Sequence, residues 1–599
     1  MISDETKQDP LYSPVHEQVW SKVPTILPLY TEFLIVGGGL SGCAAAISAA
    51  RMGVKVTLLE PTHMLGGQAG PGGVSAMDET AYYDEIIADF GFWSEFSTRV
   101  KRFYTYKLKR RVNVSQYRDD SFAPNPVVVD RVLTQMLKEQ GVQTFRNLKI
   151  SDADVRRGNA AVFTSAGRIT GRLVLDATED GCVIRLAQVP HRLGHAVFNG
   201  QQYSAEDFDS TYIQDITQTA MIRRYEQGTM PRELRLTEPP ENYSECLEIL
   251  RAAFPKGPGN SRGDHPNAFA GYRGAPDIGT DNHYTGAQWE KITRTSLNFH
   301  NDQMTNASYL LDADARAACE RAAINLTLGV IYYLQNECGL DWSVATDEGF
   351  DRAPIRRDPR VIEGLPDALA RHLPPIPYIR ESVRLVGRRT MTGKSIYRSS
   401  NRSCAAFDVT SVATGTYPPD LHGGRRPEDL EEDLEETLVD KPRTWREGPF
   451  PIPLGALIPR DKFPSIAAEK NISASRIAAG AVRLHPTVAA VGQAAGVLAA
   501  LALSHKVHPG DVPTPAVQIM LMRQGAYLPA QRIDDLRKDD DRFVPAQLAL
   551  LHQVIDEISV RPHDKAPRSR IDVDRAARMG QVIVQEYEDW LIDTALPSA

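Results

Sequence analysis

The stretch that decides the fold of this chain is Phe33–Glu60, FLIVGGGLSGCAAAISAARMGVKVTLLE. It begins with an apolar run, passes through GGGLSG at residues 37–42, continues as an alanine-rich run and ends in a second apolar run that closes on Glu60. A strand, a glycine-rich turn, a helix, a second strand and an acid at this distance form the complete dinucleotide-binding fingerprint. The stretch therefore predicts a βαβ unit that binds a dinucleotide, rather than an ordinary glycine turn.

Each fixed position of the fingerprint has a physical role. Gly37 permits the tight turn out of the strand, Gly39 lets the backbone approach a pyrophosphate, and Gly42 lets the following helix pack closely on the strand. The first amides of that helix, beside Ser41, would meet the phosphates at its positive end. Glu60 can accept hydrogen bonds from a ribose.

The composition is that of a globular protein with two or three domains. A chain of 599 residues is too long for one core, and its 42% hydrophobic and 24% charged residues are ordinary values. A net charge of −8 without a basic stripe argues against a nucleic-acid partner. Six cysteines occur without a CxxC pair, which indicates buried thiols in a reducing compartment rather than disulfides or a zinc site.

Neither the N-terminus nor the longest apolar run indicates a membrane. The opening residues, MISDETKQDP, lack the basic and apolar regions of a signal peptide. The run Thr487–Leu503 contains Gln493 and is shorter than the roughly 20 residues that a membrane span needs. We expect a buried helix, with Gly492 and Gly496 serving close backbone packing, and a cytoplasmic location.

Three features favour FAD over NAD as the dinucleotide. The glycine loop Leu65–Gly70 could let the backbone approach an isoalloxazine ring. The apolar strand that ends in Asp176-Ala177-Thr178 could bring the chain back under the ribityl-phosphate arm. His485-Pro486-Thr487 opens the apolar helix, since proline suits the first turn. The positive end of that helix could then face flavin N1 and O2, where negative charge collects on reduction.

With these motifs the chain resembles the FAD-dependent oxidoreductases with a glutathione-reductase-type FAD domain, a broad family that includes proteins described as xanthan-lyase-like. The similar segments follow the order of the family and span most of residues 33–503. They are VGGGLSGCAAA (36–46), LGGQAG (65–70), LDATEDG (175–181), IRESVRLVGRRTMTG (379–393), GTYPPDLHG (415–423), FPIPLGALIP (450–459) and AAEKNISASRIAAGAVRLHPTVAAVGQAAG (467–496).

The resemblance implies a set of residues that line FAD. They are Gly37, Gly38, Gly39, Ser41, Gly42, Glu60, Gly66, Gly67, Gln68, Asp176, Ala177, Thr178, Lys470, Asn471, Pro486 and Thr487.

Four features set this chain apart from the family pattern or bear on how the flavin is held. Many relatives have glycine in place of Glu179, and AEKNIS at 468–473 replaces the commoner AGR pattern. The family's RETRR segment is RESVR at 380–384. Relatives with a covalent flavin use a histidine near the LGG loop, where His63 lies, so covalent attachment is an alternative to non-covalent binding.

The order of the motifs predicts an α/β protein whose Rossmann-like FAD-binding domain is discontinuous in sequence. An inserted mixed α+β domain would bind the substrate, and a helical extension would follow. Residues 81–122 are rich in aromatic side chains, which would form either core or a wall of the flavin or substrate site. The expected ranges are 1–30 for an N-terminal extension, 31–185 and 456–510 for the FAD-binding domain, 186–455 for the substrate domain and 511–599 for the helical region.

Three residues are candidates for catalysis. His485 precedes the helix start at the expected flavin edge, where it would act as a base or simply bond to backbone or FAD. His422 lies in a loop that the family places facing the FAD domain, and Asp420, two residues before it, could orient its ring or simply form a turn. Arg380, with Arg384, could clamp a substrate carboxylate or phosphate, or could form an interdomain ion pair through Glu381.

The remaining histidines of the middle block show no pairing pattern. We expect His265, His283 and His300 to be surface or hydrogen-bonded loop residues, and no cluster has metal-ligand spacing, so no metal is predicted.

The chain has neither a second GxGxxG after residue 60 nor a disulfide-reductase CxxC pair. The electron acceptor would therefore meet the reduced flavin directly, and oxygen, a small organic acceptor, a partner protein or NAD(P) remain open. We expect FAD-dependent oxidation or dehydrogenation of a small organic substrate by hydride transfer to flavin N5. The alternatives are an NAD(P)H-dependent monooxygenase, a flavoprotein lyase or isomerase without net redox change, and a binding protein with a degenerate site. The substrate and the oligomeric state stay open.

Overall fold

The computed structural model describes most of the chain. The described residues are 29–77, 83–108, 113–115, 121–156, 158–199, 211–253, 273–275, 292–298, 300–351, 358–396, 408–423, 426–437, 449–555, 558–560 and 568–592.

The central sheet has four adjacent parallel strands in the order β5 (Gln143–Arg146), β2 (Val56–Glu60), β1 (Leu29–Val36) and β8 (Gly167–Asp176). β2 and the second half of β1 are buried on both faces, and these strands are accordingly continuous apolar runs. β7 (Ala160–Thr164) and β6 (Ile150–Asp154) extend the sheet as an antiparallel hairpin beyond β8.

A strand from the far end of the chain completes this sheet. β19 (Ser465–Ala467) runs parallel to β8, with Ser465 opposite Val174 and Ala467 opposite Asp176. The FAD-binding fold predicted to be discontinuous is therefore confirmed as one sheet assembled from segments about 290 residues apart.

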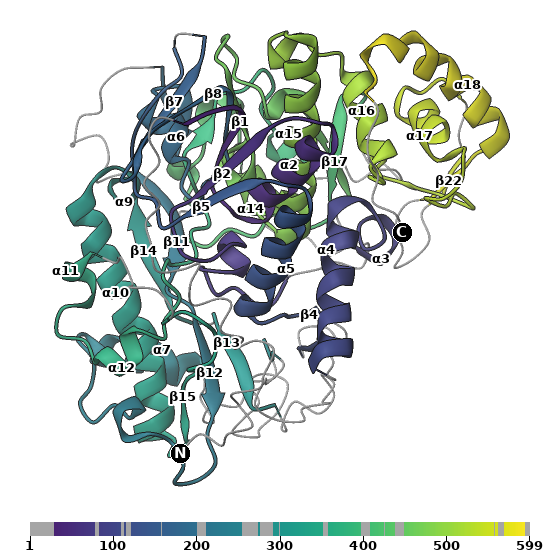
Figure 1. Cartoon of the computed structure of the whole chain (residues 1–599). Helices are drawn as coiled ribbons and strands as arrows, with labels where there is room; N and C mark the ends of the chain where they lie inside the picture. Colours follow the sequence, from purple (N-terminus) through teal and green to yellow (C-terminus); the bar gives the residue numbers. More distant parts are fainter. Residues whose placement is uncertain are drawn as a thin grey trace.

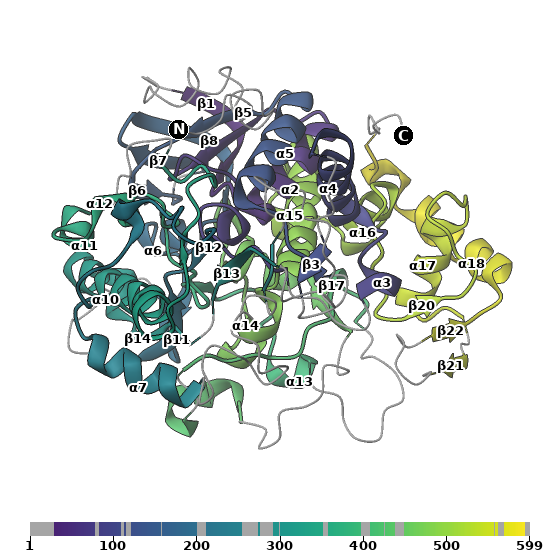
Figure 2. The same cartoon turned by 90° about the horizontal axis from the view of Figure 1, so that it is seen from below.

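Three helices stack against the sheet: α2 (Leu40–Arg51), α5 (Pro126–Glu139) and α15 (His485–His505), shown at the centre of Figures 1 and 2. α15 lies directly against α2: a Cβ built on Gly492 would be 2.1 Å from the Ser41 carbonyl oxygen, and one on Gly496 would be 2.3 Å from that of Ala45. Only glycine permits this approach, which agrees with the packing role expected for both residues. α15 is long and apolar enough to cross a membrane, but 89% of its most apolar window is buried within the protein.

The inserted region is a mixed α+β unit, at the lower left in Figure 1. It contains the strand pair β11 (Tyr212–Thr217) and β14 (Asp302–Asn306) and a three-stranded antiparallel sheet, β13-β12-β15. Its helices surround a separate apolar core that includes Ile222, Leu328 and Trp342. The bounds are β12 Ala220–Arg224, β13 Arg294–Leu297, β15 Trp342–Val344, α7 Tyr243–Ala253, α9 Ser308–Leu311, α10 Ala313–Tyr332, α11 Pro359–Ile362 and α12 Asp367–Ala370.

Parts of the block expected at 186–455 pack with the FAD-binding core. β16 (Arg384–Leu385) pairs with β9 (His191–Leu193), and Leu385 belongs to the same core cluster as Leu34 of β1. β17 (Ser411–Gly415) pairs with β18 (Phe450–Pro453), and both pack in the core that contains α15. The expected domain boundaries themselves stay predictions.

The C-terminal region is helical, as expected, and also contains a small three-stranded sheet, β20-β22-β21. The aromatic segment near residue 90 joins it to the rest: Phe90 contacts Tyr527 at 4.9 Å and Phe543 at 6.0 Å between ring centroids. Buried aromatic side chains of this segment thus form core, the first of the two roles considered for them. The bounds are α4 Gly91–Arg102, α16 Thr514–Arg523, α17 Phe543–Leu551, α18 Val573–Glu586, β20 Arg532–Ile533, β21 Ile558–Val560 and β22 Arg568–Arg570.

The remaining elements are short. They are α3 Tyr83–Ile86, β3 Asn113–Ser115, β4 Ser121–Phe122, α6 Cys182–Leu186, β10 Ala196–Phe198, α13 Gly393–Ile396 and α14 Arg476–Val482.

Candidate flavin-binding site

The turn after β1 has the geometry that its glycines predict. Gly37 has φ +103°, and a Cβ built on it would lie 2.1 Å from the Ala177 carbonyl oxygen at the end of β8. A Cβ on Gly42 would lie 1.9 Å from the Gly37 carbonyl oxygen. Strand, turn and helix are therefore in backbone contact at this turn.

A second glycine loop lies over the first. The Gly66 amide donates to the Gly38 carbonyl oxygen at 2.8 Å, and Gly39 and Gly66 form an isolated parallel bridge. A Cβ built on Gly39 would be 3.7 Å from Gly67 Cα. We call the surface formed by Gly39, Gly66 and Gly67 the glycine cradle; it joins the two loops that the sequence assigned to the cofactor.

Glu60 is tied to the fingerprint turn. Its Oε2 accepts from the Gly38 amide at 2.7 Å, and its Oε1 accepts from both the amide and the hydroxyl of Thr62 at 2.7 Å. Burial raises the pKa of Glu60 to about 7, against the lowering effect of these hydrogen bonds. The carboxyl group that could bind a ribose therefore titrates near neutrality.

Asp176, Thr178 and Asn471 hold the returning segments together. Asp176 accepts from the Thr178 hydroxyl at 2.6 Å and the Ile184 amide at 2.8 Å, and Asn471 donates to the Thr178 carbonyl oxygen at 2.9 Å. Burial raises the pKa of Asp176 to about 6. The side chain of Asp176 is thus occupied by the turn that places Ala177 against Gly37, a packing role that the sequence pattern did not reveal.

Three charged residues lie at the glycine cradle: Glu179, Glu469 and Lys470. The Gln68 amide donates to Glu179 Oε1 at 3.2 Å, and Lys470 Nζ forms an ion pair with Glu179 and lies 3.6 Å from Glu469 Oε1. The Glu469 amide donates to Ser41 Oγ at 2.9 Å. Burial, and then the charge of Glu179, raise the pKa of Glu469 to about 8. The sequence included Lys470 in the site but neither glutamate, although both stand at departures from the family pattern.

The first turn of α15 borders the same place. His485, Pro486 and Thr487 are buried there, with proline in the first turn as expected. The backbone of Val74 lies near the His485 ring, but neither ring nitrogen completes a hydrogen bond within the described part of the chain. Burial, and then the charge of Lys470, lower the pKa of His485 to about 3, so the imidazole is neutral at physiological pH.

His422 lies between two carboxylates. Its Nδ1 is 2.7 Å from Asp302 Oδ2 and its Nε2 is 3.1 Å from Asp420 Oδ2. Carboxylates only accept, so both contacts are hydrogen bonds when both ring nitrogens carry a proton. Burial opposes ionisation of Asp302 and Asp420, but hydrogen bonds from His422 hold their pKa values well below the usual range. The expected pairing of His422 with Asp420 is present, and Asp302 is a partner that the sequence did not indicate.

Arg380 is buried with both terminal nitrogens in use. Nη1 donates to the Asp215 carbonyl oxygen and Thr217 Oγ1, both at 2.8 Å, and Nη2 donates to Asp302 at 2.9 Å. Of the two roles considered, the structural ion pair is the one that these contacts favour, with Asp302 rather than Glu381 as the partner. A substrate anion would have to replace these bonds.

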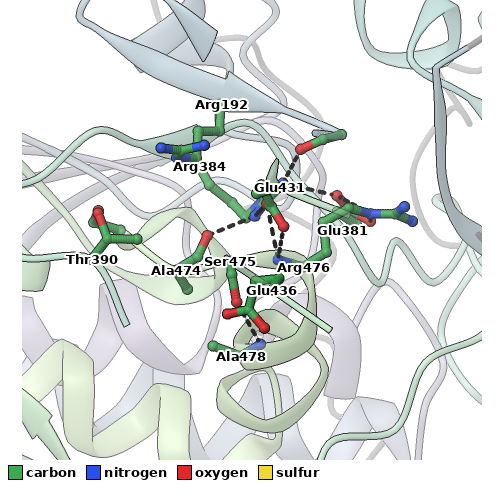
Figure 3. A network of polar contacts seen from close by, with 12 residues as sticks. Arg192, Glu381, Arg384, Thr390, Glu431, Glu436, Ala474, Ser475, Arg476 and Ala478 are labelled. Carbon is green, nitrogen blue, oxygen red and sulfur yellow. Dashed lines mark hydrogen bonds and ion pairs between the residues drawn. The ribbon is translucent and has the colours of Figure 1, made fainter. Parts of the chain in front are cut away.

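Arg384 and Glu381 belong to a buried network with Glu431 and Arg476, drawn in Figure 3. Arg384 donates to Glu431 at 2.7 Å and to Glu381 at 3.1 Å, and Arg476 Nε donates to Glu381 Oε2 at 3.0 Å. Glu431 Oε1 also accepts from the Arg476 amide at 3.0 Å, at the first residue of α14. Arg384 therefore joins three segments within the protein and is not placed to clamp a substrate.

The other histidines named from the sequence are His63, His265, His283 and His300. His63 is buried and donates from Nε2 to the Gly349 carbonyl oxygen at 3.0 Å, and His300 is exposed. His265 and His283 lie outside the described residues. Among the described residues, no group of three or more His, Cys, Asp or Glu side chains is arranged to hold a metal ion, and the five described cysteines are free thiols.

The residues present suit FAD. The glycine cradle lies over the amides at the start of α2, where the fingerprint places a diphosphate. Next to it are buried polar atoms that lack hydrogen-bond partners in the described structure, namely Gln68 Oε1, Glu469 Oε2 and both ring nitrogens of His485. Unpaired buried polar atoms of this kind are expected where a polar ligand binds. Glu179 and Glu469 are the two acids that a diphosphate would meet.

Fold and site together define a flavin-binding α/β oxidoreductase. The chain belongs to the FAD dependent oxidoreductase family, whose sequence model matches residues 32–521. The resemblance inferred from the motifs is confirmed, and FAD as the cofactor is confirmed at the level of the family.

Individual relatives are similar over shorter lengths. 3-Hydroxybenzoate 6-hydroxylase of Klebsiella oxytoca is 27% identical over 194 residues, 30% of this chain and 49% of that protein. Cinnamate reductase of Clostridium sporogenes is 48% identical over 65 residues, 10% of each chain. The chain thus spans half or less of the curated relatives it matches. Among solved structures, L-proline dehydrogenase from P. horikoshii is 14% identical, with a TM-score of 0.23, over 34% of this chain and 63% of that one.

Proposed function

We propose that the protein oxidises or dehydrogenates a small organic substrate by hydride transfer to flavin N5. The observation that supports this most directly is His485, a buried neutral imidazole at the start of α15, beside the glycine cradle and without a completed hydrogen bond in the described structure. Oxidation of a C–H bond beside a hydroxyl or amine releases a proton as well as a hydride. A neutral imidazole can take that proton when an anionic substrate beside it raises the pKa of the ring, which burial and nearby cations hold at about 3 in the free protein.

When bound, FAD supplies the two-electron acceptor. The fingerprint turn with Ser41 and Glu60, the Gly66-Gly67-Gln68 loop and Lys470-Asn471 would hold it. The start of α15, with Pro486 and Thr487, would present its positive end to the ring. The work of these residues is to bind, to orient and to exclude water, since all of them are buried.

The charges around His485 favour an anionic substrate. Lys470, Arg483 and Arg273 all lower the pKa of His485, so each is close enough for its positive charge to act on the ring. An anionic substrate group would be attracted to these cations and would also make the imidazole a better proton acceptor. The names of both curated relatives refer to aromatic carboxylates, hydroxybenzoate and cinnamate, which is consistent with this class.

The first test is an absorbance spectrum of the purified protein before and after acid precipitation, followed by anaerobic addition of NADH and NADPH. We expect a flavin spectrum that acid releases and that neither nucleotide bleaches. Aromatic and aliphatic carboxylates with an oxidisable C–H bond are then screened for anaerobic bleaching. A protein that shows no flavin and takes up none on addition of FAD contradicts the proposal.

His485→Gln separates a proton-transfer role from a packing role. Glutamine has similar size and polarity but cannot accept the proton, so the rate of flavin reduction should fall by about 10²-fold and its pH profile should change. Unchanged FAD affinity is the control. If the rate and the profile are both unaltered, His485 has only a structural role.

An NAD(P)H-dependent monooxygenase is the second candidate, favoured by the similarity to a hydroxylase. It predicts rapid bleaching by NADH or NADPH that substrate stimulates. A flavoprotein lyase or isomerase predicts turnover without net flavin reduction. The same anaerobic experiment distinguishes all three.

A further inference from the structure

The glycine cradle holds two carboxylates at the position where the fingerprint binds a diphosphate. A Cβ built on Gly39 would lie 3.4 Å from both Glu179 Oε1 and Glu469 Oε2. A Cβ built on Gly67 would lie 2.1 Å from Glu179 Oε1. Both acids therefore fill the small space that the glycines leave open above the first turn of the 12-residue helix α2.

The donors that bind the Glu179 carboxylate are of the kind that would bind a phosphate. It accepts from the Gln68 amide at 3.2 Å and pairs with Lys470, which is 1% exposed. A backbone amide and a buried lysine are also the donors that bind a phosphate. Glu179 thus uses the groups on which a diphosphate would depend.

The Glu469 carboxyl group has fewer hydrogen-bond partners than that of Glu179. It is 1% exposed, and its Oε2, directed over Gly39, has no hydrogen-bond partner in the described structure. Its backbone has φ +56°, a left-handed conformation that suits glycine and is uncommon for other residues. This residue stands where the commoner family pattern has glycine.

We propose that Glu179 and Glu469 compete with the FAD diphosphate for the glycine cradle. FAD then binds in this chain only when the ion pair between Glu179 and Lys470 breaks and Glu469 carries a proton. The inference rests on the proposed function, because it takes FAD as the ligand. It assigns to this site a cofactor affinity that depends on pH.

Several charged or titratable groups act on Glu469 or on the lysine and glutamates beside it. Burial of Cys43 keeps its thiol protonated, because its pKa is raised well above the usual value. The pKa of Glu60 is about 7, so below that pH its carboxyl group becomes protonated and accepts hydrogen bonds from a ribose less well. The groups are Cys43 on α2, Glu60 on β2, Glu179 after β8, Tyr378 before β16, Lys470 beside Glu469, and His485 on α15.

The sign of the pH dependence follows from Glu469. Its pKa of about 8 means that the free site is already protonated below pH 8, so FAD affinity should be flat between about pH 7 and 8. Above that value each binding event must take up a proton, and the affinity should fall about tenfold per pH unit. The fall should end once the pKa of the FAD-bound state is passed.

The test titrates FAD into flavin-free full-length protein between pH 7 and 9.5 and follows the flavin fluorescence. The variants are Glu179→Gln, Glu469→Gln and Glu469→Gly. Glu436→Gln is the matched control, since burial also raises the pKa of Glu436 but its carboxylate accepts from the Gly393 amide, in the region of Figure 3. The midpoint of thermal unfolding is measured for every variant at each pH.

We expect Glu469→Gln and Glu469→Gly to abolish the fall above pH 8, and to bind FAD about tenfold tighter than wild type at pH 9. Glu179→Gln should bind about tenfold tighter at pH 7, because Lys470 becomes available. Wild type that binds FAD equally at pH 7 and 9, with unchanged affinity in folded variants, overturns the inference and leaves the proposed function intact. Folded wild type and variants that bind no FAD at any pH overturn both.

Discussion

Two histidines near the candidate site differ in what their ring nitrogens contact. His485 is buried among cations and neutral, whereas His422 lies between Asp302 and Asp420 and can bond to both when doubly protonated. Among the described residues, His485 therefore has no carboxylate partner within hydrogen-bonding distance, whereas both ring nitrogens of His422 face one. From sequence the two were equal candidates, because neither the burial of His485 nor the contact of His422 with Asp302, which lies far away in the chain, is visible in the local motifs.

At the same scale, the buried network of Figure 3 should be sensitive to the loss of one charge. Glu431→Gln leaves the guanidinium of Arg384 buried against a neutral amide, and removing one partner of a buried pair costs about 3–5 kcal/mol. We expect the free energy of unfolding, measured in urea, to fall by up to about 3–5 kcal/mol.

Glu432→Gln is the control, because Glu432 is the exposed neighbour of Glu431 and the same chemical change there should cost under about 0.5 kcal/mol. Equal stabilities of the two variants would mean that the network contributes little, as happens when buried pairs only repay their desolvation.

At the scale of elements, the apolar runs were the reliable signal. Residues 33–36 and Arg172–Ala177 lie in or at the end of the buried strands β1 and β8, and Thr487–Leu503 lies within α15. The glycines of α15 could be assigned to close packing because a small residue in an apolar helix has few other uses. The sequence could not show that α2 is the helix on which α15 packs, because neither helix carries a pattern that identifies its packing partner.

Gly492→Ala tests this helix contact. Alanine improves helix propensity by about 1 kcal/mol, but its Cβ would lie 2.1 Å from the Ser41 carbonyl oxygen. Overpacking of this kind costs about 1–3 kcal/mol, so the variant should be less stable despite its propensity. It should also bind FAD more weakly, because Ser41 lies in the first turn of α2.

Ser504→Ala on the same helix is the matched control for that prediction. Ser504 is exposed, so the change gains propensity without a clash and should leave stability equal or slightly higher. A stabilised Gly492→Ala protein with unchanged FAD affinity would show that the two helices can separate without cost.

The short elements and the acid pair mark the limit of sequence reasoning. β19, β16 and β17 have two to five residues, too few for a periodic pattern, and each pairs with a strand supplied by another part of the chain. Glu179 and Lys470 are 291 positions apart. Both were visible as departures from a motif, but their meeting over Gly39 depends on β8 and β19 lying side by side.

At the scale of the whole molecule, the flavin site is an assembly point for distant segments. The fingerprint comes from residues 33–60, the turn after β8 contributes Glu179, and the return segment contributes Lys470 and α15. The inserted region reaches the same place through Thr219, whose hydroxyl donates to the Gly72 carbonyl oxygen at 2.7 Å. A ligand at this point therefore contacts groups that come together only in the folded chain.

FAD should accordingly raise the midpoint of thermal unfolding. A ligand that binds only the folded state stabilises it by about 2.7 kcal/mol at a free concentration of 100 times its Kd. The measurement is a circular dichroism melt with increasing FAD at pH 7 and pH 9; the shift at a fixed FAD concentration should be smaller at pH 9, where Glu469 is ionised. Riboflavin, which lacks the diphosphate, is the control and should show little of this difference between the two pH values. A midpoint that does not move with FAD up to millimolar concentrations would mean that the cradle, with its two acids, does not accept the dinucleotide at all.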